Sequence, residues 1–171
     1  MIVKKNDRLM SIDASINNLG MAIWDIPSKK LLLWKLVHPK VNCRKNEYVK
    51  SLSMSNQLRE WARTYAVNHM ILEVPSHWSV GGFEARETGS IAKLCFVCGL
   101  IYSMQYEMEE FKFVKPSDWK GHTPKHAMAN RLQNEYVKYG IDMNGIVTGI
   151  KLNENVADAI GIGHYYIFGS V

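Results

Sequence analysis

Three acidic residues stand within apolar sequence and could together bind a divalent cation. Asp13 follows MSI, Glu73 follows MIL, and Asp158 lies within NVADAIGIGH. A carboxylate in a core-like setting is costly unless it is paired, hydrogen-bonded or metal-bound. No Lys or Arg stands in equally apolar sequence, so three such acids on separate elements indicate a shared cation. Mg²⁺ prefers oxygen ligands, and two such ions about 4 Å apart can activate water for phosphodiester hydrolysis.

Basic and aromatic residues near these acids indicate a polyanionic substrate. The chain has 21 Lys and Arg against 16 Asp and Glu, a net charge of +5, which favours binding to polyanions. Three lysines in the stretch KPSDWKGHTPK are predicted to contact phosphates: Lys115, Lys120 and Lys125. The Gly-rich stretch after Glu73 contributes two aromatics for stacking on unpaired bases and one cation: Trp78, Phe83 and Arg86. The competing interpretation is a solvated loop with an aromatic anchor.

Hydrophobic periodicity predicts the elements that position these residues. Three consecutive strands, expected at 8–14, 19–26 and 31–37, suit an antiparallel meander. Helical spacing and short apolar runs then alternate, predicting helices at 46–67, 86–106, 122–140 and 154–168 and strands at 69–74 and 111–114. The order βββαβαβαα predicts an α/β fold with a central five-stranded mixed sheet covered by helices. If strands 8–14 and 69–74 are parallel neighbours, Asp13 and Glu73 project near the same edge.

The composition suits one globular domain rather than a membrane or secreted protein. Its 171 residues are 47% hydrophobic and 22% charged. The longest apolar stretch, LCFVCGLIY at 94–102, is far shorter than the roughly 20 residues that span a bilayer. We therefore expect a cytoplasmic protein with no membrane partner. Cys95 and Cys98 lie in this apolar run and are expected to be buried thiols of a reducing compartment.

The acid motifs together resemble those of RuvC-type Holliday junction resolvases, in the ribonuclease-H-like superfamily. The resemblance rests on SIDASINNLGMAIWD, MILEVPS and NVADAIGIGH in this order, and it covers roughly 8–168. It implies a single RuvC-like endonuclease domain over 1–171, with Asp13, Glu73 and Asp158 as catalytic metal ligands and Lys125 beside them. The family's fourth ligand precedes the last Asp by three residues, where this chain has the neutral Asn155. Glu154 is the alternative ligand. Without a metal-binding role, both residues would be explained as the first residues of a helix, where Asn is a favoured N-cap and Glu is favoured by the helix dipole.

The resemblance implies a metal-dependent endonuclease that resolves four-way DNA junctions by paired hydrolysis, in DNA recombination and repair. It implies Mg²⁺, replaceable by Mn²⁺, with two ions at the site. It also implies a homodimer formed through the long apolar helix, in a bacterial cell or a phage-infected host. Two alternatives remain open. The same acids would serve an RNA or RNA–DNA hybrid nuclease of this superfamily, and Asn155 would suit a catalytically weakened junction-binding protein.

Overall fold

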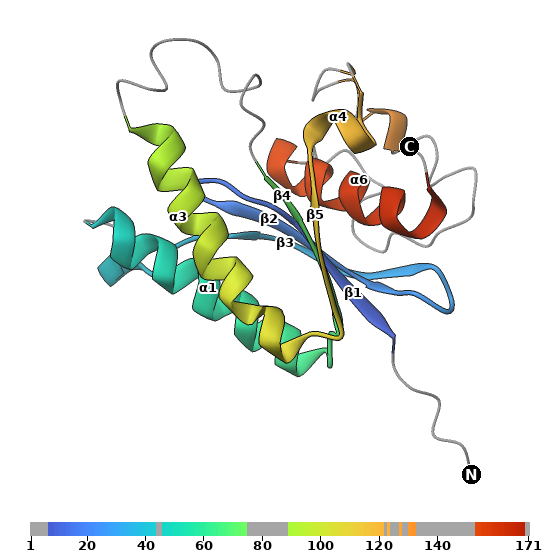
Figure 1. The fold of residues 1–171 in the computed structure, drawn as a ribbon, viewed down its shortest axis with the longest axis horizontal. Coiled ribbons are helices and arrows are strands. Elements are labelled where there is room, and N and C mark those ends of the chain that lie inside the picture. The colour runs from blue at the N-terminus through green and yellow to red at the C-terminus, as the bar shows by residue number, and fades with distance from the viewer. Residues whose placement is uncertain are drawn as a thin grey trace.

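A five-stranded mixed sheet forms the centre of the protein (Figure 1). The computed structural model describes residues 7–43, 46–74, 89–121, 123, 127, 130–132 and 153–169. The strands lie in the order β3-β2-β1-β4-β5. Their bounds are Arg8–Asp13 (β1), Leu19–Asp25 (β2), Lys30–Val37 (β3), His69–Glu73 (β4) and Glu110–Val114 (β5). The predicted five-stranded mixed sheet is confirmed.

The strand directions follow from the connections between the strands. β1, β2 and β3 pair antiparallel through short turns, whereas β4 is parallel to β1 and β5 is parallel to β4 after helical crossovers. The condition under which Asp13 and Glu73 were expected at the same edge, parallel pairing of the first and fourth strands, is therefore met. β1 is central in the sheet, and all of its residues from Leu9 onward are buried. This burial on both faces explains its nearly continuous apolar sequence.

Helices cover the two faces of the sheet (Figure 1). α1 (Glu47–Thr64) and α3 (Ser90–Tyr102) lie on one face, and the 3₁₀ helix Ser103–Glu107 continues α3. α4 (Pro116–Trp119) and α6 (Glu154–Phe168) lie on the other. Each face has its own apolar core, because successive side chains of a strand point to opposite faces. Met10 and Ile12 join the core beneath α1 and α3, whereas Leu9 joins the core beneath α6.

Helix α6 lies directly on β1 and β2 because glycines remove the side chains between them. A Cβ atom on Gly20 would lie 1.8 Å from the backbone oxygen of Asn155, and one on Gly163 would lie 2.1 Å from Trp24 Nε1. The Ser11 hydroxyl of β1 donates a hydrogen bond of 2.7 Å to the carbonyl of Ala159. These contacts set the axial position of α6, which carries Asp158, against the strand that ends at Asp13.

Some sequence predictions were wrong or fall outside the described residues. Cys95 is exposed, whereas the buried residues of α3 are Val97, Cys98 and Ile101. The predicted helix at 122–140 lies mostly outside the described residues. Helix α4 was not predicted, since four residues are too few to show helical periodicity. No helix in the described part of the chain is long and apolar enough to span a membrane.

Candidate active site

Asp13 and Glu73 lie side by side at one edge of the sheet. Asp13 is the last residue of β1 and Glu73 the last residue of β4, and the parallel register pairs them directly. Parallel strands bring their carboxyl ends to the same edge, which is where open α/β sheets bind ligands. Asp13 is 4% exposed and buried among apolar neighbours. Two acids on adjacent strand ends therefore face the same small volume.

Asp158 joins this edge from helix α6. It lies in the second turn of the helix and is fully buried, with 0% exposure. The ammonium group of Lys120 donates a hydrogen bond of 3.0 Å to Asp158 Oδ2 and lies 3.9 Å from Glu73 Oε2. One cation thus contacts carboxylates from two separate elements. Glu73 of β4 and Asp158 of α6 therefore both contact Lys120, and Asp13 is the register partner of Glu73 on β1.

Lys120 lies beside two of the predicted acids, and its predicted role in contacting nucleic-acid phosphates stays a prediction. Its side chain is only 10% exposed, and its ammonium lies over the Trp119 ring at 4.7 Å. Its position beside two carboxylates is favourable, because an ammonium lowers the cost of burying negative charge. As they stand, no three His, Cys, Asp or Glu side chains in the described residues form a metal-binding group. The Lys120 ammonium instead lies where a cation shared by Glu73 and Asp158 would lie.

Asn155 and Glu154, the two candidates for a fourth ligand, have different environments. Glu154 is exposed in the first turn of α6, and Asn153 is the N-cap, accepting a hydrogen bond of 3.0 Å from the Asn155 backbone N–H. The Asn155 side-chain amide donates to the carbonyl of Asn18 at 3.0 Å. Residues three apart share a helix face, so Asn155 lies on the face of Asp158. The Asn155 side-chain nitrogen is used in the hydrogen bond to Asn18 in the β1–β2 turn. The Asn155 side-chain oxygen is therefore the atom that could bind a cation.

The remaining predicted residues lie at the surface or outside the described chain. Lys115 is exposed at the start of α4. The predicted contacts of Lys125, Trp78, Phe83 and Arg86 lie outside the described residues.

Two neighbours of the site were missed by sequence reasoning. The Trp119 indole N–H donates to Glu73 Oε2 at 2.6 Å, and Lys50 of α1 donates to Asn17 Oδ1 in the turn after Asp13 at 3.0 Å. The presence of a Trp within the basic stretch was the only sequence feature that could have indicated the Trp119–Glu73 hydrogen bond. Nothing in the sequence linked α1 to the turn, because that contact depends on how the helix packs.

Cys98 approaches the acids from the α3 side of the sheet. Burial, followed by the negative charges of Cys95, Asp13 and Glu73, raises the pKa of the Cys98 thiol to about 12. A thiol with this pKa is neutral at physiological pH and binds metal poorly, because the thiolate is the metal-binding form. The chemistry available at this edge is therefore that of carboxylate oxygens.

Holliday junction resolvases are among the solved structures that are similar to this chain. Thermus thermophilus RuvC, in complex with a Holliday junction substrate, has a TM-score of 0.66 at 14% identity, covering 95% of this chain and 94% of that chain. The fowlpox virus resolvase, in a complex with junction DNA, has a TM-score of 0.58 at 16% identity, covering 95% and 97%. The yeast mitochondrial Holliday junction resolvase has a TM-score of 0.57 at 13% identity, covering 96% and 79%.

These likenesses define the class of fold. The chain has the fold of RuvC and of these two other Holliday junction resolvases, as the resemblance of its acid motifs implied. No protein-family model matches the sequence, and no curated protein matches it in sequence. Because the identities are low, the likeness is one of fold, and the function has to be argued from the site.

Proposed function

We propose that this protein is a metal-dependent endonuclease that resolves four-way DNA junctions during recombination or repair. The observation that carries the proposal is the shared cation position between Glu73 and Asp158, next to Asp13, on a resolvase fold. Many unrelated activities use the same fold, so the acids carry more weight than the architecture. Three carboxylates on three elements suit phosphodiester hydrolysis better than they suit a purely structural role.

The donor atoms fit a hard divalent cation. Asp13, Glu73 and Asp158 supply carboxylate oxygens, which Mg²⁺ and Mn²⁺ prefer, and Asn155 supplies a neutral carbonyl oxygen. The Lys120 ammonium marks where positive charge is stabilised between two of these acids. When bound, a pair of such ions supplies water activation and stabilisation of the leaving oxygen. The protein itself holds the acids in place, while Lys115 and Lys125 bind substrate phosphates.

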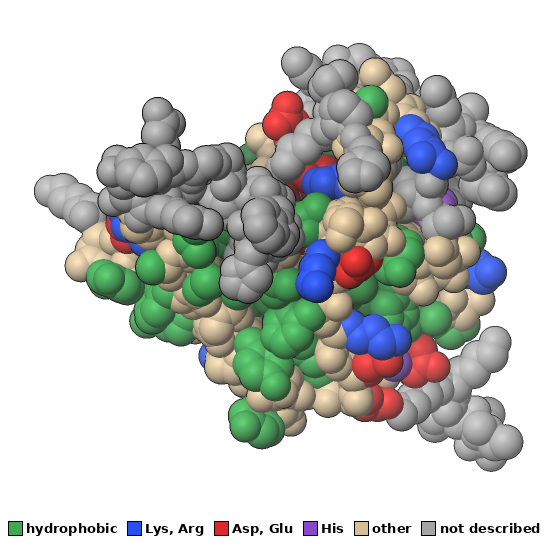
Figure 2. Space-filling view, turned by 45° about the horizontal axis from the view of Figure 1, so that its top comes forward, with side chains coloured by type: hydrophobic (Ala, Val, Ile, Leu, Met, Phe, Trp, Pro, Cys, Tyr) green, Lys and Arg blue, Asp and Glu red, His purple; other side chains and the backbone are tan. Residues whose placement is uncertain are grey.

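An exposed apolar surface supports a homodimer. Phe96, Tyr102 and Phe113 are 39%, 39% and 50% exposed on α3 and β5, and Figure 2 shows hydrophobic side chains gathered on this part of the surface. A cavity of about 270 Å³ lies there, lined by Val74, Cys95, Cys98, Gly99, Tyr102 and Phe113. Contiguous exposed apolar surface is typical of protein interfaces. A two-fold dimer would offer two active sites to the opposed strands of a symmetric junction.

A cleavage assay tests the proposal. A four-way DNA junction, a linear duplex and an RNA–DNA hybrid would be 5′-labelled and incubated with Mg²⁺ or Mn²⁺, while sedimentation velocity reports the oligomeric state. We expect paired nicks in the junction only, from a dimer. Asp158→Asn should keep junction binding and lose cleavage by at least about 100-fold. Asp25→Asn is the matched control, because Asp25 is the last residue of β2 and its carboxylate accepts a hydrogen bond from the Ser28 backbone N–H in the turn to β3.

Other outcomes would replace the proposal. Hybrid cleavage with an intact junction would make the protein an RNA–DNA hybrid nuclease. Tight junction binding without cleavage under either metal would make it a binding protein, and Asn155→Asp would then be the first variant to test for restored activity. Full cleavage by Asp158→Asn would refute the assignment of the acids.

A further inference from the structure

Trp119 contacts Glu73 directly, and no sequence motif assigned it a role there. We propose that Trp119 is a positioning residue that fixes the Glu73 carboxylate for metal binding. The contact itself stands on the structure, whereas the role of Glu73 as a metal ligand rests on the proposed function. The inference concerns how one ligand is held in place.

The hydrogen bond between the two residues is short and charge-assisted. Trp119 Nε1 donates to Glu73 Oε2 at 2.6 Å, and hydrogen bonds from N–H donors to ionised carboxylates are shorter than those between neutral groups. An indole has one donor and no acceptor, so its whole hydrogen-bonding capacity is committed to this carboxylate. Trp119 is 4% exposed, and water therefore competes little for the donor. Burial and charge make this a strong contact for its type.

Glu73 needs such a partner because its backbone position does not fix its carboxylate. Pairing with Asp13 at the end of β4 fixes the Cα atom, but a Glu side chain keeps several rotatable bonds beyond it. Lys120 lies farther away, at 3.9 Å from Glu73 Oε2, and its ammonium is a point charge on a flexible stem. The rigid indole, in contrast, selects one orientation of the carboxylate.

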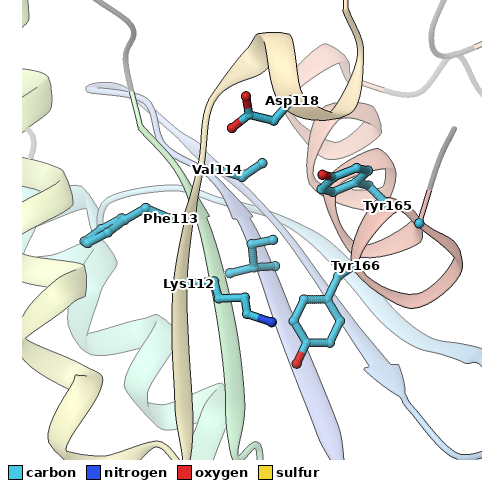
Figure 3. Close-up of a pocket in the computed structure, with 8 residues that line it drawn as sticks. Lys112, Phe113, Val114, Asp118, Tyr165 and Tyr166 are labelled. Atoms are coloured by element: carbon cyan, nitrogen blue, oxygen red, sulfur yellow. The ribbon is translucent and has the colours of Figure 1, made fainter.

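The Trp119 ring is itself held by α6. A Cβ atom on Gly161 would lie 2.4 Å from Trp119 Cζ3, so the ring lies against the helix where only glycine leaves room. The position of α4 is set by Pro116 in its first turn and by the Asp118 carboxylate, which accepts from the Lys115 backbone N–H at 2.9 Å. Figure 3 shows Asp118 above Val114, with α4 joining the end of β5 to the side of α6.

This packing couples two of the proposed metal ligands. Helix α6 carries Asp158, and the same helix seats the ring that holds Glu73. Any displacement of α6 therefore moves the donor on which the Glu73 orientation depends. Partners behind metal ligands typically contribute 10–100-fold to metal affinity, because they orient the ligating oxygen before the metal arrives.

Metal binding by Trp119→Phe tests the proposal. Phe keeps an aromatic ring against Gly161 but cannot donate a hydrogen bond to Glu73. Isothermal titration with Mn²⁺ should show affinity lowered by about 10–100-fold. Trp61→Phe is the matched control: Trp61 lies on α1, where its ring lies under the Lys35 ammonium at 4.5 Å, and its affinity should equal that of the wild type. Mn²⁺ affinity of a folded Trp119→Phe within about twofold of the wild type would overturn the proposal.

A spectroscopic signature separates positioning from a general loss of structure. The chain has five Trp residues and so five indole N–H signals in a ¹H–¹⁵N spectrum. The signal lost in Trp119→Phe identifies Trp119. Glu73→Gln, which removes the charge of the acceptor, should shift that signal more than the other four. If Trp119→Phe fails to fold, triple-resonance assignment of the wild type identifies the Trp119 signal instead, so the test still applies. An unmoved Trp119 signal would overturn the proposal.

Neither measurement uses DNA, so the two proposals can fail separately. Tight Mn²⁺ binding that depends on Trp119, together with an uncut junction, would refute junction resolution and support the positioning role. If the protein cleaves the junction and Trp119→Phe binds Mn²⁺ as tightly as the wild type, only the positioning role of Trp119 is refuted.

Discussion

Replacing Lys120 with Met should destabilise the metal-free protein and make its stability depend more strongly on Mg²⁺. Met keeps most of the length of the side chain and removes the ammonium. The wild-type ammonium lies 3.0 Å from Asp158 Oδ2, in a pair whose side chains are 10% and 0% exposed. Without it, Asp158 and Glu73 would share a buried site that contains no positive charge from α4.

The magnitude follows from the burial of this ion pair. Removing one partner of a buried pair typically costs about 3–5 kcal/mol, because the other charge stays behind. At about 2–4 °C per kcal/mol for a chain of this size, the melting temperature in EDTA should fall by about 6–20 °C. Mg²⁺ no longer competes with the ammonium in the variant. Each tenfold gain in Mg²⁺ affinity would then add about 1.4 kcal/mol of stabilisation at saturating metal.

Thermal unfolding followed by circular dichroism, in EDTA and across a Mg²⁺ titration, measures both effects. Lys115→Met is the matched control, because Lys115 lies in the same segment with an exposed side chain. Its free energy of unfolding should change by less than about 0.5 kcal/mol. If Lys120→Met melts within about 2 °C of the wild type in EDTA, or if Mg²⁺ stabilises both proteins equally, the Lys120 ammonium does not occupy the cation position.

Two further predictions test the packing of α6 and the far end of the sheet. Gly20→Ala should lower the free energy of unfolding by about 3 kcal/mol or more, because its Cβ would lie 1.8 Å from the Asn155 backbone oxygen. Gly99→Ala, with open space around its Cβ, is the control in urea denaturation, and equal losses would contradict the close approach of α6. Hydrogen bonds from Lys112, then Tyr166 and His69, lower the pKa of Glu110 from 4.5 to about 2. A depressed pKa stabilises the fold above pH 4.5, and that contribution is lost as the pH falls towards 2. The melting temperature of the wild type should therefore fall more steeply over this interval than that of Glu110→Gln, and parallel curves would show that Glu110 does not contribute.

The sequence by itself singled out three acids in apolar surroundings and predicted the elements that carry them. Asp13 and Glu73 stood out because each ends a short apolar run, and burial of a carboxylate has a cost that a local pattern already reveals. The strands and α6 were predicted from periodicity, since a period of two or 3.6 is a property of neighbouring residues. The bounds of α6, Glu154–Phe168, agree with the prediction because Asn153 provides a capping signal.

Only the tertiary structure decided how these residues meet. The register that pairs Asp13 with Glu73 depends on β1 and β4 lying side by side, across about 60 residues of intervening chain. Cys95 is exposed because α3 has apolar residues on more than one face, and its packing buries only one of these faces. Lys120 and Trp119 reached the acids because α4 packs against α6 through Gly161, a contact between segments about 40 residues apart. A local sequence pattern shows that a charged side chain will be buried. Which residue pairs with that charge depends on how elements distant in the sequence pack together.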